Sequence, residues 1–170
     1  MSAPSIREAI ERVAANIAAD PAKARAKNVP ATARLTEKLR CEVTGPYQER
    51  LVTDMPPAMG GTAAGPNPGW LLRSAMASCT ATAIALRAAR LDVALSALEV
   101  VVESESDNRG LLGMDEGISA GLGALRTRVR IAGNAAPQAL RDIVAWAEAH
   151  SPVTCTVRNA TPCALDIEVG

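Results

Sequence analysis

The hydrophobic positions of this chain follow a helical spacing in three segments. Apolar residues recur every three or four positions over residues 5–19, where Ser5 and Glu8 fit a capping box, and this pattern predicts an amphipathic helix. An Asn-Pro pair opens residues 67–90, which predict a second, longer helix. A third helix is expected over residues 137–150. The apolar stripe predicted for the second helix consists of Leu72, Met76, Cys79, Ala83 and Leu86.

Elsewhere, apolar and polar side chains alternate strictly, which predicts strands. Residues 31–43 alternate as one half-buried strand, and residues 47–54 are expected to return beside it after a Gly-Pro turn. Residues 97–106 and 124–132 alternate in the same way. A last strand is expected over residues 163–169, CALDIEV.

Two stretches rich in glycine or proline separate these elements. Residues 55–68, MPPAMGGTAAGPNP, and residues 107–123 predict two long loops, and loops of this length in a compact domain are usually functional or mobile. The order of elements is helix, hairpin, loop, long helix, two strands, helix and strand. This order predicts an α+β fold with an antiparallel sheet and helices packed on one side of it.

The charge balance narrows the possible partners. Lysine plus arginine and aspartate plus glutamate number 18 each in 170 residues, without a basic patch, so we expect neither nucleic acid nor a membrane as a partner. No segment reaches the roughly 18–20 apolar residues that span a bilayer. The N-terminal segment mixes acids with bases, unlike a secretory signal. We therefore expect a cytoplasmic protein.

The four cysteines differ in their surroundings. Cys41 and Cys163 lie on the apolar faces of predicted strands, where cysteine is typically a buried core residue. Cys79 lies on the apolar stripe of the long helix, among small residues, and is either a core residue or a nucleophile. Cys155, in SPVTCTVRN, follows a helix stop and is expected in or beside a turn, where functional residues are common.

The chain offers few ligands for a metal ion. No CxxC pair occurs and His150 is the only histidine, so we expect neither a metal site nor a cofactor. His150 itself has two interpretations. Its charged form would be favoured at the C-terminal end of a helix, or it would favour the thiolate of the nearby Cys155.

Two motifs together carry a resemblance to a known family. The first, MGGTAAGPNPGWLLRSAMASCTA, combines a glycine-rich loop, an Asn-Pro helix start and a helix cysteine, and the second, AEAHSPVTCTV, follows it with another cysteine after a later helix. This pattern resembles the OsmC/Ohr family, the osmotically induced protein C and organic hydroperoxide resistance proteins. By this resemblance, residues 1–28 are an N-terminal helical extension and residues 29–170 an OsmC-like domain.

The resemblance implies an OsmC-like α+β fold, in which an antiparallel sheet accompanies a long central helix that bears a cysteine. It also implies an intertwined homodimer with two such helices packed at its centre. The small residues that would allow this close packing are Ala75, Ala77, Ser78, Ala81 and Ala83.

In the peroxidases of this family, the helix cysteine attacks a hydroperoxide and becomes a sulfenic acid, which the second cysteine resolves as a disulfide. Carried over by position, Cys79 would be the peroxidatic residue and Cys155 the resolving residue. The resemblance thus implies a thiol-dependent peroxidase that reduces organic hydroperoxides or hydrogen peroxide and is recycled by an external dithiol.

The family peroxidases also place a glutamate and an arginine beside the thiolate. The glutamate follows the Asn-Pro pair, and this chain has Gly69 there. Arg40 lies near the place of the arginine in one subgroup, and Arg50 is a further candidate for stabilising the thiolate. Arg73 is also near in sequence, but by helical angle it points away from Cys79, so it would have to act across the dimer.

The missing glutamate leaves two alternatives to a peroxidase. The first is a non-peroxidase OsmC-like dimer that binds a small apolar ligand beside Cys79 or performs other thiol chemistry. The second is that Cys79 and Cys155 are packing residues only.

Overall fold

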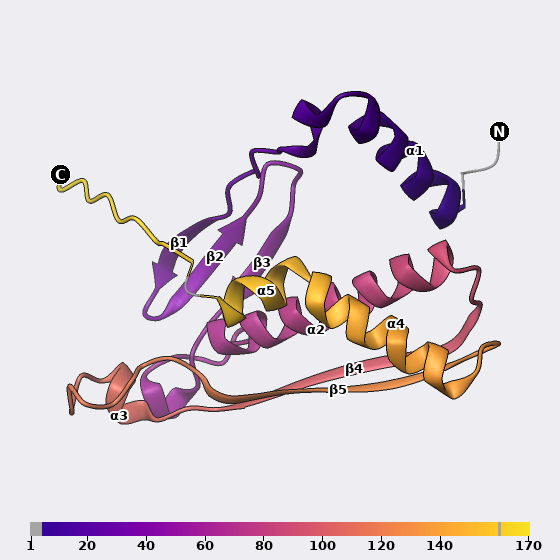
Figure 1. Cartoon of the computed structure of the whole chain (residues 1–170). Helices are drawn as coiled ribbons and strands as arrows, with labels where there is room; N and C mark the ends of the chain where they lie inside the picture. Colours follow the sequence, from indigo (N-terminus) through magenta and orange to yellow (C-terminus); the bar gives the residue numbers. More distant parts are fainter. Residues whose placement is uncertain (1–4, 160) are drawn as a thin grey trace. The chain divides into compact units, whose positions relative to one another are not determined.

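The computed structural model describes residues 5–159 and 161–170 as an α+β chain with antiparallel strand pairs, as the sequence predicts. It forms two compact units, one containing the chain up to Ser74 with Glu103–Leu125, and the other containing Ala75–Val102 and Arg126–Gly170. The helices and strands (Figure 1) are α1 (Ile6–Ala19), η1 (Pro21–Ala24), β1 (Thr32–Glu37), β2 (Arg40–Thr44), β3 (Arg50–Thr53), η2 (Pro57–Met59), α2 (Pro68–Arg90), β4 (Leu95–Glu105), α3 (Asn108–Leu111), β5 (Gly123–Gly133), α4 (Pro137–His150) and α5 (Pro152–Arg158).

The three predicted helices are confirmed, with their expected caps in two cases. In α1, Ser5 Oγ accepts from the backbone N–H of Glu8, and Glu8 Oε2 accepts from the N–H of Ser5 at 2.7 Å, which completes the capping box. In α2, Asn67 Oδ1 accepts from the N–H of Trp70 at 2.8 Å. Such caps satisfy backbone donors that a helix start leaves without partners.

The first unit contains a three-stranded antiparallel sheet in the order β1-β2-β3. The expectation of one strand over residues 31–43 is wrong, because the chain reverses at Lys38 and Leu39 and forms a hairpin. Lys38 has the positive φ of 50° that such a tight turn uses. Leu35 pairs with Cys41 across the turn, so both share a sheet face despite the reversal. The alternation of apolar and polar residues therefore continues through the hairpin, and in the sequence it resembles that of one continuous strand.

The loop after β3 is organised by Asp54, whose residue is only 2% exposed. Its carboxylate accepts from the Thr62 hydroxyl at 2.6 Å and from three backbone N–H groups, those of Met55, Thr62 and Ala64. The loop runs so close to β3 that a Cβ at Gly65 would collide with the carbonyl of Val52. Most of the loop is irregular, as expected, but η2 occupies part of it.

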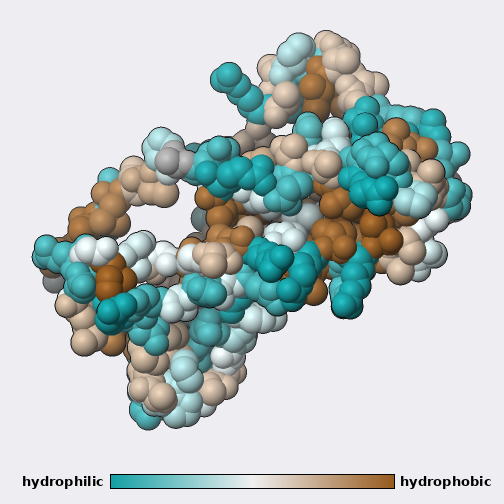
Figure 2. All heavy atoms as spheres, turned by 60° about the horizontal axis from the view of Figure 1, so that its bottom comes forward, coloured by the Kyte–Doolittle hydropathy of each residue, from teal (hydrophilic) through white to brown (hydrophobic). Residues whose placement is uncertain are grey.

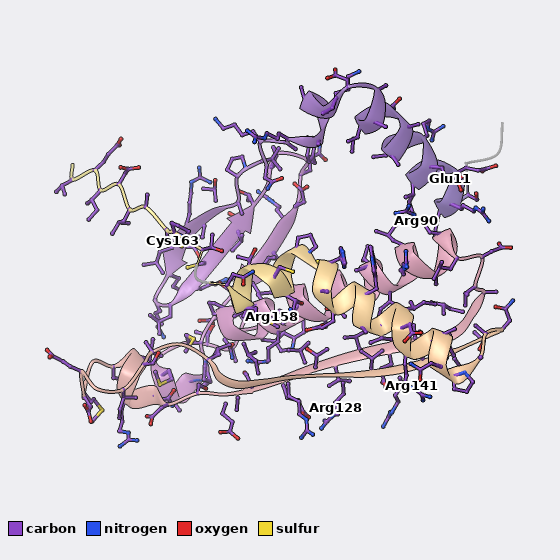
Figure 3. The ribbon with its side chains drawn as sticks, in the orientation of Figure 1. Glu11, Arg90, Arg128, Arg141, Arg158 and Cys163 are labelled. Atoms are coloured by element: carbon purple, nitrogen blue, oxygen red, sulfur yellow. The ribbon has the colours of Figure 1, made fainter. Side chains whose placement is uncertain are left out.

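The second unit has its own hydrophobic core. Ile84 of α2 and Ile143 of α4 are 0% and 1% exposed and lie at its centre. β4 and β5 pair as expected, and their apolar residues pack against the helices. Figure 3 shows the side chain of Arg128 on the opposite face of this strand pair. The buried residues of this core are Ala83, Ile84, Ala88, Ile143 and Ala147.

The apolar stripe predicted for α2 is only partly correct. Met76 and Ala83 are buried, but Leu72 and Leu86 are 37% and 40% exposed. The buried positions are Met76, Thr80, Ala83, Ile84 and Ala88, a line rotated from the predicted one. As a result, Thr80 is buried, although the sequence pattern favours burial of the more apolar Leu86.

Two expectations near the C-terminus are wrong. The segment around Cys155, expected in or beside a turn, forms the helix α5, because Ser151 caps its first turn and Pro152 fits the first helical position. Residues 163–169 form no strand and are exposed, and Cys163 is exposed instead of buried in a core. No neighbouring strand pairs with this segment, and a strand without a partner is not stable in water.

Several large apolar side chains lie at the surface of the described residues. Figure 2 shows such apolar patches among polar ones. Leu35 on β1 is 68% exposed, and Ile167 near the C-terminus is 74% exposed. Within the part of the chain that the structure describes, no helix combines the length and the apolar character that a membrane crossing requires.

Candidate functional site

Cys79 lies in the middle of α2, and its residue is half-buried with a free thiol. The buried positions of the helix face the core of the second unit, and Thr80, the next residue, is completely buried. Cys79 therefore lies at the edge of the buried face, which is where a thiol keeps access to solvent. This position is compatible with both interpretations of Cys79, since the residue is neither fully buried nor exposed.

Cys155 lies in α5, and it too is half-buried and free. Its thiol donates to the carbonyl oxygen of Ala149, which belongs to the end of α4, at 3.3 Å. Arg158 of α5 forms an ion pair with Glu148 of α4 at 2.7 Å, and Figure 3 shows Arg158 on the short helix next to α4. These two contacts hold α5 against the preceding helix.

A buried pair of hydroxyls joins α2 to α5. Thr80 Oγ1 and Thr154 Oγ1 lie 3.3 Å apart, and the two residues are 0% and 4% exposed. Thr80 directly follows Cys79, and Thr154 directly precedes Cys155. The two helices thus touch one residue away from each cysteine. A buried hydroxyl needs a hydrogen-bond partner, so this pairing also fixes the rotation of both helices.

The arginines predicted beside the thiolate lie on the three-stranded sheet, in the other unit. Arg40 begins β2 at an exposed position, and its carbonyl accepts from the Thr36 hydroxyl at 3.1 Å. Arg50 begins β3, its side chain is 75% exposed, and its Nη2 forms an ion pair with Glu42 Oε1 at 3.2 Å. A role for either arginine at Cys79 stays a prediction.

His150 ends α4 and bonds within its own helix. Its Nδ1 lies 2.7 Å from the carbonyl oxygen of Trp146, and its ring stacks on the Trp146 ring at 4.1 Å. The guanidinium of Arg87, on α2, lies 4.9 Å from the centre of the same ring. Such a bond to a last-turn carbonyl is typical of a histidine at a helix end. This stack of three side chains was not expected from the sequence, because it joins two helices far apart along the chain.

A pocket of about 280 Å³ lies in the first unit, where the loop after β3 meets the first turns of α2. Asp54 lines it, and its pKa lies well below the usual range, because the Thr62 hydroxyl and the backbone N–H groups of the loop donate to it. Arg73 is the cation of the pocket, and its Nη1 donates to Ser104 Oγ at 3.0 Å. The lining residues are Asp54, Pro56, Ala63, Gly65, Pro66, Asn67, Trp70 and Arg73.

Gly69 lies on α2 one helical turn before Arg73. A Cβ built there would be 3.8 Å from Arg73 Nη1 and 3.3 Å from Asn67 Oδ1. The position of the family glutamate is therefore next to an arginine of the same helix. The sequence contains a signal for this contact, since residues four apart on a helix are neighbours. Elsewhere, within residues 5–159 and 161–170, no three His, Cys, Asp or Glu side chains cluster as a metal site requires.

The family of the chain follows from comparison with known proteins. A model of the OsmC-like protein family matches residues 60–166. The chain belongs to the OsmC-like family. The matched segment contains both Cys79 and Cys155, whereas Arg40 and Arg50 precede it. No curated protein sequence matches the chain.

Solved OsmC-like structures share the fold of this chain. An OsmC-like protein from Mycoplasma pneumoniae is similar with a TM-score of 0.69 and 18% identity, covering 80% of this chain and 91% of its own. An organic hydroperoxide resistance protein from Legionella pneumophila is similar with a TM-score of 0.62 and 20% identity, covering 79% of this chain and 91% of its own. An organic hydroperoxide resistance protein from Elizabethkingia anophelis has a TM-score of 0.63 and 17% identity, covering 80% of this chain and 91% of its own. Because the sequence identities are this low, the similarity between the chain and these structures concerns the fold alone.

Proposed function

We propose that this OsmC-like chain is a thiol-dependent peroxidase that reduces organic hydroperoxides or hydrogen peroxide. The observation that carries the proposal is the Thr80–Thr154 contact, because it joins the two helices one residue away from Cys79 and Cys155. Both thiols are free and half-buried. The names of two structural relatives, both organic hydroperoxide resistance proteins, support the same substrate class.

The reaction proceeds in two steps at sulfur. The thiolate of Cys79 attacks the terminal oxygen of the hydroperoxide and the O–O bond breaks, so Cys79 becomes a sulfenic acid and the alkoxide leaves as the alcohol after taking a proton from solvent. The thiolate of Cys155 then attacks that sulfur, and hydroxide leaves as water. An external dithiol reduces the resulting disulfide by two thiol–disulfide exchanges.

The protein acts as a homodimer in this proposal. One side of α2 in the second unit carries exposed residues at helical spacing, namely Ala75, Ser78, Thr82 and Leu86. The first three are small, so a second copy of α2 can approach closely there. Ala83, expected at this seam, is 7% exposed and belongs to the core of its own chain.

The experiment adds one equivalent of cumene hydroperoxide to the reduced full-length chain and maps the disulfides by mass spectrometry. A Cys79–Cys155 disulfide is expected, and Cys79→Ser should abolish both the disulfide and peroxide consumption. Cys155→Ser should instead leave a sulfenic acid on Cys79 that dimedone traps. The double variant Cys41→Ser/Cys163→Ser is the control and should behave as the native chain. Unchanged thiols in excess peroxide would exclude the peroxidase.

A second candidate is a dimer that binds a small apolar ligand without peroxide chemistry. Gly69 in place of the family glutamate favours it, because the chain then lacks the carboxylate that the family peroxidases place beside the thiolate. This candidate predicts ligand binding in a protein whose thiols survive the peroxide treatment. The two candidates are therefore separated by the same reaction.

A further inference from the structure

The pocket beside the start of α2 has an apolar lining with one available cation. Its apolar surface comes from Pro56, Ala63, Pro66 and Trp70, and the Trp70 residue is 50% exposed. The side chain of Arg73 completes it. With a volume of about 280 Å³, the pocket lies at the small end of the range for ligand sites, so it suits a small molecule.

Arg73 has donor groups to spare. Its residue is half-buried, and Nη1 donates to the neutral hydroxyl of Ser104 at 3.0 Å. Among the residues that the structure describes, no carboxylate forms an ion pair with Arg73. A guanidinium carries five N–H donors in a planar fork that matches a carboxylate. Most of this recognition capacity is therefore unused.

Residue 69, a glycine, places no side chain beside the guanidinium. The Cβ position of Gly69 lies at ordinary contact distance, 3.8 Å, from both Arg73 Nη1 and Leu122 Cδ2. A side chain built there would reach toward the guanidinium, since positions i and i+4 share a helix face. With glycine, a ligand group can take the place that a carboxylate side chain would fill.

Asp54, the anion that lines the pocket, does not compete for the same role. Its two oxygens accept four hydrogen bonds from its own loop, and the residue is 2% exposed. These donors stabilise the negative charge of the Asp54 carboxylate within its own loop. Asp54 thus shapes the loop, and Arg73 is the lining group with free donors.

We propose that Arg73 anchors the carboxylate of a small amphipathic acid in this pocket, while Trp70 and the prolines contact the apolar part of that acid. The ligand class is a short- or medium-chain fatty acid or an arylcarboxylic acid. Binding does not require a reaction at sulfur, so it holds for either candidate function.

Isothermal titration calorimetry on the full chain with octanoate, 1-octanol and octylamine tests the charge preference. Octanoate should bind at least about tenfold more tightly than 1-octanol, because a charge-assisted hydrogen bond is worth about that factor. Arg73→Gln should remove this advantage and leave 1-octanol binding unchanged. Equal affinity for the acid and the alcohol, or tighter binding of octylamine, would overturn the proposal.

Gly69→Glu gives a second test on the same helix. The new carboxylate, four residues before Arg73, should pair with it and weaken octanoate binding about tenfold or more. Gly69→Gln is the matched control of equal size and should retain affinity within about threefold. An equal loss in both variants would show that bulk is what matters, and would overturn the role of the Arg73 charge. Cys79→Ser should bind octanoate like the native chain, which separates this result from the fate of the peroxidase proposal.

Discussion

The hydroxyl oxygens of Thr80 and Thr154 lie 3.3 Å apart in the interior of the second unit. Each residue is the chain neighbour of a cysteine, so the contact couples the packing of α2 and α5 to the positions of Cys79 and Cys155. The pair is also isolated from the solvent, since the residues are 0% and 4% exposed. A buried hydroxyl without a partner is costly, which makes this contact testable by substitution.

Replacement of one threonine by valine should therefore destabilise the protein more than replacement of both. Thr80→Val or Thr154→Val leaves a buried hydroxyl alone and should lower the free energy of unfolding by about 1–3 kcal/mol. The double variant removes both polar groups with nearly the same shape and should lose less than about 1 kcal/mol. Urea unfolding of the four proteins measures the coupling. Additive losses would show that the two hydroxyls do not interact.

The carboxylate of Asp54 should make the stability of the loop after β3 dependent on pH. Its pKa is held well below the usual range by the Thr62 hydroxyl first, and also by backbone N–H groups of the loop. In the unfolded chain, the pKa of an aspartate is about 3.9. The stabilisation is therefore complete above that pH and is lost as the pH falls through the lower pKa of the folded state.

Asp54→Asn is the variant that checks this dependence. The asparagine side chain offers one acceptor oxygen to the donors that the two carboxylate oxygens bind, so the variant should be less stable at pH 7. Urea midpoints of both proteins should converge as the pH falls from 5 toward 2. Asp115→Asn, at an exposed loop position, should show no such convergence. A constant difference at every pH would contradict the role of the charge.

The sequence predicts the long helices α1, α2 and α4 well, because caps and periodicity are local. Ser5 with Glu8, and Asn67 before Pro68, define helix starts that no distant contact alters. The family motif likewise depends on local order around the two cysteines. This local information was sufficient for the fold class and for the family.

Features that depend on distant partners were missed. Leu86 is more apolar than Thr80, yet Thr80 is the buried one because Thr154, from α5, satisfies its hydroxyl. The alternation of residues 163–169 predicts a strand, but a strand requires a neighbour that a single segment does not reveal. By its helical angle, Arg73 is expected to act at Cys79 only across a dimer, and the sequence does not indicate its hydrogen bond to Ser104 or its place beside the Gly69 position.

A charge on the exposed side of α2 should separate the proposed dimer. Thr82 is exposed in the single chain, so Thr82→Arg should fold, but it places a long cation at the proposed seam between two α2 helices. Light scattering coupled to size exclusion should give the native protein about twice the chain mass of 17.6 kDa and the variant the single mass. Ala145→Arg, at an exposed position of α4, is the matched control and should remain dimeric. A dimeric Thr82→Arg protein would place the interface elsewhere.

The relative reactivity of the cysteines should reveal whether Cys79 is activated. Cys163 is exposed, whereas Cys79 is half-buried, so access alone favours alkylation of Cys163. The thiolate is the reacting form, and an ordinary cysteine is only a few per cent thiolate at pH 7. If Cys79 is the peroxidatic residue, iodoacetamide should modify it at least about tenfold faster than Cys163, in spite of its lower exposure. Mass spectrometry of peptides over a time course gives both rates in one sample.

Treatment with one equivalent of hydroperoxide before alkylation completes this test. It should protect Cys79 and Cys155 together, because the disulfide consumes both thiols, and leave the rate at Cys163 unchanged. In Cys155→Ser, Cys79 should still be protected, since its sulfenic acid no longer carries the thiolate that iodoacetamide attacks. If Cys163 reacts first and the peroxide protects none of the three, the half-buried cysteines are ordinary packing residues, and the binding function of the pocket beside Arg73 becomes the better account of the chain.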